Sequence, residues 1–322
     1  MERNQETKGV LLLGFGGPGG PEEVKPFMAK LMGGRTPGPD LVARVWSRYQ
    51  AIGGSSPLLE ITLAQAAALE KNLEAEKNQA NDQWKVYVGM GYWRPWIRDA
   101  VARMKKDGIK KGVAISLAPF YSRVSTGAYV RELDLALQEF QSPEIKLCRQ
   151  WHLNPLYIKA LANRVKESLR GISPQVAREI PVVFTAHSLP LNHIGAGDPY
   201  VKQARETMTA VSRQLDSQPA YLAFQSKGGS SGPWLEPEVQ SVLLDLSREG
   251  YRLVVVLPFG FVSDHVETLY DLDIELKQYA QSLGLELVRA PALNDAPEFI
   301  SALAEIARED YNLFFAAGGN DE

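Results

Sequence analysis

Apolar residues gather along the chain into short runs that are nearly continuous rather than alternating. Runs of this kind, rich in β-branched residues and bounded by Gly, Pro or Ser, are typical of strands buried on both faces of a parallel sheet. Longer stretches between them carry apolar residues at helical spacing. The pattern predicts strands at 9–15, 85–90, 112–118, 145–151, 181–186, 220–225, 252–258 and 285–289.

Helices are predicted between these strands, for example at 96–106, 129–140, 158–169 and 237–248. Strands that alternate with helices imply right-handed crossovers and a doubly wound α/β architecture. The long segment between the first two strands is predicted to hold three more helices, at 22–32, 40–49 and 56–78, with Ser56 as the N-cap of the last. Helices inserted after a first strand are well placed to wall a cleft, so we interpret them as a lid.

The predicted strands divide evenly, with four before about residue 151 and four after about residue 180. We therefore expect two Rossmann-like halves, 1–150 and 151–322, each with a four-stranded parallel sheet flanked by helices. The first half should carry the lid helices, and the segment after Ser301 should pack back on it. Ligands of such sheets bind beyond the carboxyl ends of the strands, so chemistry is expected there.

The composition mainly excludes certain classes of protein. A net charge of −3, with 45% hydrophobic and 23% charged residues, is ordinary for a soluble globular protein and argues against nucleic-acid binding. The polar start MERNQETKGV is no secretory signal, and the apolar runs fall far short of the roughly 20 residues of a membrane span. We expect a cytoplasmic monomer without an integral membrane segment. The single cysteine, Cys148, excludes a disulfide framework.

A glycine-rich segment, Gly14 to Gly19, follows the first predicted strand and matches the G-x-G-x-x-G dinucleotide fingerprint. Its context is unfavourable for NAD, because Pro18 and Pro21 interrupt the turn and no acidic residue ends a second strand about 20 positions on. A tight turn that lets a ligand or another backbone approach closely is the better interpretation.

His187 ends the fifth predicted strand, where Pro190 restricts the residue before it to extended conformations. A neutral imidazole at a strand end can accept a proton or bind a first-row metal ion near neutral pH. The alternative is a half-buried histidine bonded to a carbonyl. His152 and His193 lack such a context and are interpreted as packing or surface residues.

An acidic stripe is predicted after the seventh strand, on a helix capped by Ser263. At spacings of three, four and four, its members share one helical face: Asp264, Glu267, Asp271 and Glu275. A column of carboxylates could conduct protons or a divalent cation, and oxygen with imidazole ligands suits Fe²⁺. The alternative is a solvated acidic face near a helix start. His265 could also be a ligand, but it lies two residues from Glu267 and is predicted to point off this face.

Aromatic residues gather at the remaining strand ends and together would suit a large flat ligand, because aromatic faces stack on extended π-systems. They are Phe15, Tyr92, Trp93, Phe120, Tyr121 and Trp234. Nearby donors could hold carboxylates at the rim of such a ligand, namely Ser55, Ser56, Ser122, Arg123, Ser125 and Tyr129. For any single aromatic, core packing is the alternative.

Several long motifs stand in an order that resembles the ferrochelatase family, enzymes that insert ferrous iron into a porphyrin. The landmarks are RYQAIGGSSPL at 48–58, TAHSLP at 185–190, QS at 225–226 with PWL at 233–235, and GFVSDHVE at 260–267. The resemblance runs from residue 9 to about 306 and implies a chelatase-like fold with a porphyrin cleft between two halves. The chain is similar to the short bacterial enzymes, many of which metallate coproporphyrin III rather than protoporphyrin IX.

The resemblance also implies roles for particular residues. His187 and Glu267 match the catalytic and metal-binding pair, and Asp271 with Glu275 match an acidic line leading away from it. Ser56, Ser125 and Tyr129 match positions near the porphyrin propionates, and Trp234 matches an aromatic near the cleft. Phe15 and Tyr121 complete the expected porphyrin-binding set. Phe15 stands where some relatives carry a tyrosine able to ligate iron, so that contact is lost here.

On this interpretation the partners are a porphyrin and Fe²⁺ as substrates, with no tightly bound cofactor and no iron–sulfur cluster. The alternative function is non-catalytic binding and delivery of a tetrapyrrole or a metal. The combination of His187 with Glu267 favours catalysis, because a carrier needs no base.

Overall fold

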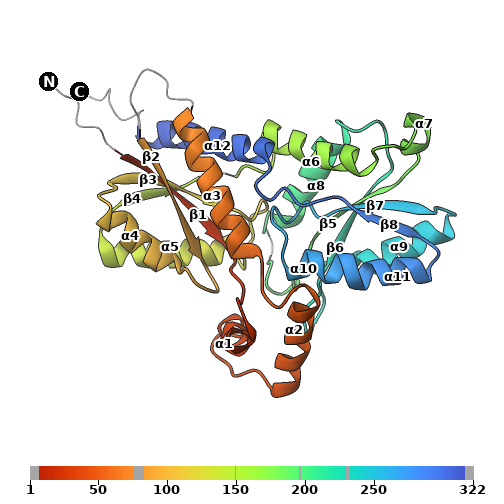
Figure 1. Cartoon of the computed structure of the whole chain (residues 1–322), viewed down its shortest axis with the longest axis horizontal. Helices are drawn as coiled ribbons and strands as arrows, with labels where there is room; N and C mark the ends of the chain where they lie inside the picture. Colours follow the sequence, from red (N-terminus) through yellow and green to blue (C-terminus); the bar gives the residue numbers. More distant parts are fainter. Residues whose placement is uncertain (1–6, 76–82, 149, 196, 230–231, 316–322) are drawn as a thin grey trace.

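The computed structural model of the chain describes residues 7–75, 83–148, 150–195, 197–229 and 232–315. Its strands form two four-stranded parallel sheets, which lie side by side in Figure 1 and confirm the predicted fold class. The first sheet has the order β2-β1-β3-β4, with β1 at Thr7–Gly14, β2 at Gln83–Met90, β3 at Lys111–Ser116 and β4 at Glu144–Leu147. The second has the order β6-β5-β7-β8, with β5 at Val182–His187, β6 at Ala220–Gln225, β7 at Leu253–Leu257 and β8 at Glu286–Arg289.

Helices cover both faces of each sheet (Figure 1). On the first sheet α4 (Ile97–Lys106) and α5 (Thr126–Phe140) cover one face, and α3 (Leu58–Ala75) with α12 (Pro297–Phe315) the other. On the second, α9 (Val239–Arg248) and α11 (Lys277–Ser282) lie opposite α6 (Pro155–Ser168) and α8 (Tyr200–Ser212). A short helix, α7 (Pro174–Ala177), precedes β5.

Strand β1 shows why near-continuous apolar runs mark this fold. Val10 and Leu12 belong to the core under α3 and α12, whereas Leu11 and Leu13 belong to the core under α4 and α5. All four side chains are fully buried. Because successive side chains of a strand point to opposite faces, a strand covered on both faces has no polar position to alternate with.

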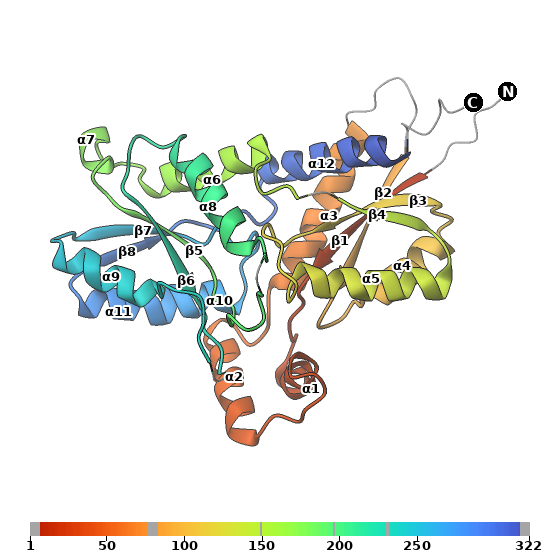
Figure 2. The same ribbon diagram turned by 180° about the vertical axis from the view of Figure 1, so that it is seen from behind.

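Helix α12 connects the cores of the two halves, and both views place it along α3 and α6 (Figures 1 and 2). Near its start the ring of Phe299 lies 6.3 Å from that of Tyr157 on α6. Near its end the ring of Tyr311 lies 5.2 Å from that of Trp84 on β2. The division of the chain at residue 150 stays a prediction.

The lid consists of α1 (Pro21–Leu31) and α2 (Pro39–Ala51), which stand below both sheets in Figures 1 and 2. They share a small core with the segment after β2, built around Val24, Phe27, Met28 and Tyr49 of the lid and Trp93. The third predicted helix, α3, instead packs along the first sheet, and only its start faces the cleft. Its predicted end at 76–78 lies outside the described residues.

The glycine turn after β1 permits a close backbone approach. Gly16 has a φ of 92°, and a Cβ atom there would lie 2.9 Å from the backbone nitrogen of Trp93. Glu23 of α1 then accepts hydrogen bonds of 2.8 Å from the Gly19 amide and the Trp93 indole. The lid is therefore anchored beside the end of β1. Among the described helices, none is both long and apolar enough to cross a membrane.

Candidate active site

A cavity of about 340 Å³ lies where the carboxyl ends of the two sheets and the lid meet. Pockets for small organic ligands fall in the range of about 300–1,000 Å³. The lining is mostly apolar and comes from the ends of β1 and β5, from α1, α2, α3 and α5, and from the loop between β7 and α10 (Val266–Leu269). A larger hollow of about 740 Å³ lies along β8 and α11, away from all of these segments.

Most of the predicted site residues line the 340 Å³ cavity: Phe15, Ser56, Ser125, Tyr129, His187 and Glu267. Tyr121 and Trp234 are not among the described residues that line it. The backbone amide of Tyr121 donates to Gln203 on α8, and Trp234 is buried against Gly228. Asp271 and Glu275 lie further along the chain from Glu267, outside the described lining.

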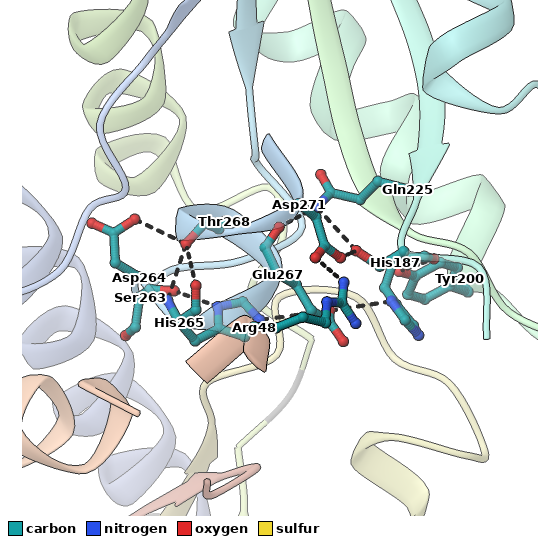
Figure 3. Close-up of polar contacts among 11 residues, drawn as sticks. Arg48, His187, Tyr200, Gln225, Ser263, Asp264, His265, Glu267, Thr268 and Asp271 are labelled. Carbon is teal, nitrogen blue, oxygen red and sulfur yellow. Dashed lines mark hydrogen bonds and ion pairs between the residues drawn. The ribbon is translucent and has the colours of Figure 1, made fainter. Parts of the chain in front are cut away.

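The side chains of His187 and Glu267 face each other at the wall of the cavity (Figure 3). Nδ1 of His187 lies 3.2 Å from Oε2 of Glu267, an ion-pair distance, although among the described residues Nδ1 has no partner in hydrogen-bond geometry. The side chains are 30% and 27% exposed, so both are reachable from the cavity. The Tyr200 hydroxyl donates to the backbone carbonyl of His187 at 3.0 Å and fixes that end of β5.

The pairing of β5 with β6 places the end of a second strand beside His187 and Glu267. Gln225 is the β6 partner of His187, and its Nε2 donates to the backbone carbonyl of Glu267 at 2.7 Å. The carboxyl ends of β5 and β6 therefore hold the histidine and the glutamate at one edge of the sheet. In the sequence Gln225 is only part of a landmark motif, because a side-chain bond to a distant backbone carbonyl leaves no local pattern.

Burial and charge compete at both members of the pair. Burial by itself would lower the pKa of His187, but the neighbouring Glu267 carboxylate outweighs it, so the pKa of His187 is raised above its ordinary value. Burial would raise the pKa of Glu267, but the charge of His187 and a contact with His265 hold the pKa of Glu267 far below its usual range. Glu267 is therefore an anion, and His187 holds a proton more readily than an isolated histidine.

His265 corrects one prediction, since it contacts Glu267 instead of pointing away. Its Nε2 lies 3.6 Å from Oε2 of Glu267, and its Nδ1 lies 3.0 Å from the backbone carbonyl oxygen of Ser263, so Nδ1 is the donor there. Helix α10 begins after His265, whose backbone is extended with a φ of −162°. A residue in that position does not follow the helical spacing used for the prediction.

The prediction that Ser263 caps this helix is also wrong. Its hydroxyl is buried and accepts a hydrogen bond of 2.9 Å from Gln65 of α3, and the N-cap is His265. The hydroxyl of Thr268 completes the capping box by accepting from the His265 amide at 3.0 Å. The competing partner lies 198 residues away in the chain, so local sequence could not reveal it.

The acidic stripe is also only partly as predicted. Asp264 precedes the helix and lies apart from the pair in Figure 3, bound to Arg289, Asn294 and Thr268. Glu267 lies in α10, whereas Asp271 and Glu275 lie in a π-helix, η1 (Asp271–Leu276), in which the Glu275 amide donates to the carbonyl of Tyr270, five residues back. A regular α-helical spacing therefore does not describe this face.

Arg48 of the lid helix α2 was missed as a site residue. Its guanidinium forms an ion pair with the buried carboxylate of Asp271 (Figure 3). It also lies 4.0 Å from the carboxylate of Glu275. Burial and the nearby Glu267 keep the pKa of Asp271 above its usual value despite this cation. Ser226 also donates to Asp271. The only signal was indirect: carboxylates close together on one face repel each other, so a nearby cation stabilises them, but its place in the chain is not encoded locally.

In the described part of the chain, no three His, Cys, Asp or Glu side chains form a ready-made metal site. His187 and Glu267 offer an imidazole and a carboxylate, two ligands that suit a first-row divalent ion. The arrangement is therefore a base beside an anion on the wall of an apolar cavity.

The family model described as Ferrochelatase matches residues 7–311, nearly all of the described chain. The chain belongs to the ferrochelatase family. A ferrochelatase of Deinococcus radiodurans is 39% identical over 306 residues, which cover 94% of this chain and 96% of that protein. A coproporphyrin III ferrochelatase of Anoxybacillus flavithermus is 35% identical over 304 residues, covering 94% and 96%.

Among solved structures, SirB from Bacillus subtilis with Fe³⁺ matches this member of the ferrochelatase family with a TM-score of 0.60. The match covers 98% of this chain and 99% of that chain at 14% sequence identity. An identity this low speaks for the fold alone, and it confirms the chelatase-like arrangement of two parallel sheets.

Proposed function

We propose that the protein inserts Fe²⁺ into a porphyrin, with the ring bound in the 340 Å³ cavity and His187 and Glu267 acting on its centre. The contact of 3.2 Å between these two side chains carries the proposal, because it sets a base and an anion together on the wall of an apolar pocket. Membership of the ferrochelatase family supports the same reaction. Iron is a substrate here, and two pyrrole protons leave the ring.

His187 is the proposed proton acceptor. In its neutral form the ring can take a pyrrole proton, and the adjacent Glu267 carboxylate then stabilises the imidazolium that results. Glu267 stays ionised through this step and is the proposed ligand that draws Fe²⁺ toward the ring. Asp271 and Glu275, which lead from Glu267 along η1 and are linked to the lid by Arg48, are the proposed path for metal or protons.

The reaction can be tested with the purified protein under anaerobic conditions. Adding Fe²⁺ to the protein with metal-free coproporphyrin III, and in parallel with protoporphyrin IX, should give the absorption spectrum of the metallated ring in at least one mixture. We propose coproporphyrin III as the preferred substrate, which the name of the Anoxybacillus relative supports. Tight porphyrin binding without any metallation would instead favour the delivery function.

Replacing donors at the rim should weaken porphyrin binding. The Ser125 hydroxyl is buried without a hydrogen-bond partner among the described residues, and burial raises the pKa of Tyr129, so its phenol keeps its proton and can donate. With Ser56 they are the proposed donors to the propionates. Ser125→Ala and Tyr129→Phe should raise the KM for porphyrin about 5- to 20-fold and lower kcat less, the pattern of uniform binding.

Steady-state kinetics with porphyrin as the varied substrate measure this split. Ser247→Ala, which removes a hydroxyl bonded to the Leu283 carbonyl far from the cavity, is the matched control and should leave the KM for porphyrin unchanged. A collapse of kcat at constant KM would instead place the rim residues in the chemical step.

The remaining expectations accompany this proposal. A porphyrin position for Tyr121 and Trp234 stays a prediction, since neither is among the described residues that line the cavity. The absence of a tightly bound cofactor, a monomeric state and a cytoplasmic location also stay predictions. Within these 322 residues one cysteine cannot supply the four thiolates of a typical iron–sulfur cluster.

A further inference from the structure

Asn294, in the loop between β8 and α12, has every polar group of its backbone and side chain engaged. Its amide donates to the carbonyl of Val262 at 2.8 Å, and its carbonyl accepts from Gln65 of α3 at 2.8 Å. Its side chain makes a reciprocal pair with Asp264, since Oδ1 accepts from the Asp264 amide and Nδ2 donates to the carboxylate, both at 2.9 Å. This asparagine joins the first half to the loop before α10.

Arg289, at the end of β8, binds residues on both sides of Glu267 in the chain. One guanidinium nitrogen donates to Asp264 at 3.0 Å and Nε donates to Asp273 in η1 at 2.7 Å. The arginine is only 13% exposed, so these bonds are largely shielded from water. Asp264 lies three residues before Glu267 and Asp273 six residues after it, so Arg289 ties together the two flanks of the glutamate.

Glu267 lies in the first turn of a longer helix. Helix α10 spans four residues, and after Tyr270 it continues through η1 into α11. The first turn of a helix leaves backbone amides without helical partners, and a π-turn has poorer hydrogen bonding than a regular helix. Contacts from outside this turn therefore help to fix the position of Glu267.

We propose that Asn294 and Arg289 are positioning residues that hold Glu267 against His187. Neither is among the described residues that line the cavity, so both act through the segment they brace. The proposal rests on the proposed function for its readout. It adds to that function a chain of hydrogen bonds around Glu267. The chain starts at Gln65, a fully buried residue of α3, and ends at Asp273.

The sharpest test is Asn294→Gly. Asn294 has a φ of 46°, a left-handed conformation that glycine adopts freely, so the substitution removes the side-chain bonds without straining the backbone. Displacement of a reacting group by about 1 Å can cost on the order of 10²-fold, so kcat should fall about 10- to 100-fold. Binding of metal-free porphyrin, followed by fluorescence, should stay within about twofold of the parent protein, because the cavity lining is unchanged.

Gln141→Gly is the matched control. Gln141 is also left-handed, with a φ of 55°, and is exposed at the end of α5 in the other half. It should retain the parent kcat. Parent-level kcat in Asn294→Gly, or equal losses in Asn294→Gly and Gln141→Gly, would overturn the proposal.

Arg289 gives an independent second arm. Arg289→Ala should lower kcat, free guanidinium ion should restore part of it by occupying the space between Asp264 and Asp273, and Arg289→Lys should lose less than alanine. Loss of porphyrin binding in step with kcat, or the lack of any restoration, would indicate general disruption and overturn the role of Arg289. Failure of the unmodified protein to metallate a porphyrin would instead overturn the proposed function, which separates the two failures.

Discussion

Replacing His187 with alanine should lower turnover by about 10²-fold or more, while metal-free porphyrin still binds. The expectation follows from geometry, because His187 is the histidine at the cavity wall whose Nδ1 faces the Glu267 carboxylate at 3.2 Å. Its loss removes the proposed proton acceptor and leaves the apolar lining intact. Anaerobic turnover with Fe²⁺ and fluorescence titration with the same porphyrin measure the two quantities separately.

The matched control is His193→Ala, which removes a histidine from the loop after β5 that is not among the described lining residues. It should retain turnover close to that of the parent protein. Near-normal turnover in His187→Ala would mean that solvent or another group takes the pyrrole protons, and the assignment of His187 would be wrong.

Replacing Glu267 with glutamine should also lower turnover by at least about 10²-fold, and it should change the pH dependence of what remains. In the parent protein the carboxylate raises the pKa of His187. Turnover should therefore fall as the pH drops through that raised value, because a protonated imidazole cannot accept a proton. Without the carboxylate, burial lowers the pKa of His187 and is opposed only by the charge of Asp271.

The acid limb of the kcat profile should therefore lie at lower pH in Glu267→Gln than in the parent protein. Profiles of kcat between about pH 5 and 9, at saturating porphyrin and iron, measure the shift. Glu275→Gln is a suitable comparison, because this carboxylate is 58% exposed and lies further along the chain, and it should leave the acid limb in place. An acid limb unchanged in Glu267→Gln would show that another group controls it.

The fold followed from sequence because its main determinants are local. Each strand is a short apolar run, and burial on both faces of a parallel sheet makes such runs unmistakable. Helix α4, predicted at 96–106, begins one residue later, and β6 has the predicted bounds. Strand β4 ends at Leu147, earlier than predicted, because the apolar residues beyond it pack as loop: the Trp151 indole donates to the carbonyl of Ser116.

The site was predictable only where strand ends fix it. His187 could be expected at the edge of a sheet, and Glu267 follows β7, the strand beside β5 in that sheet. The partners of these residues come from distant segments: Arg48 lies 223 residues from Asp271, and Gln65 lies 198 residues from Ser263. Nothing in local periodicity encodes such contacts. The π-turn also shifted the register of the acidic face, since an α-helical spacing was assumed.

The continuous core under α12 has a consequence for how a substrate reaches the cavity. Independent domains swing about a hinge unless a large apolar interface joins them, and here one apolar cluster runs from Leu12 on β1 to Phe184 on β5. Rotation of one half against the other would separate the residues of that cluster and expose them to water. The lid helices belong to a smaller cluster and are tied to the two halves by Trp93 and by the Arg48–Asp271 pair, so they can shift at lower cost. We therefore expect α1 and α2 to move when a substrate enters the cavity, while the two sheets keep their relative position.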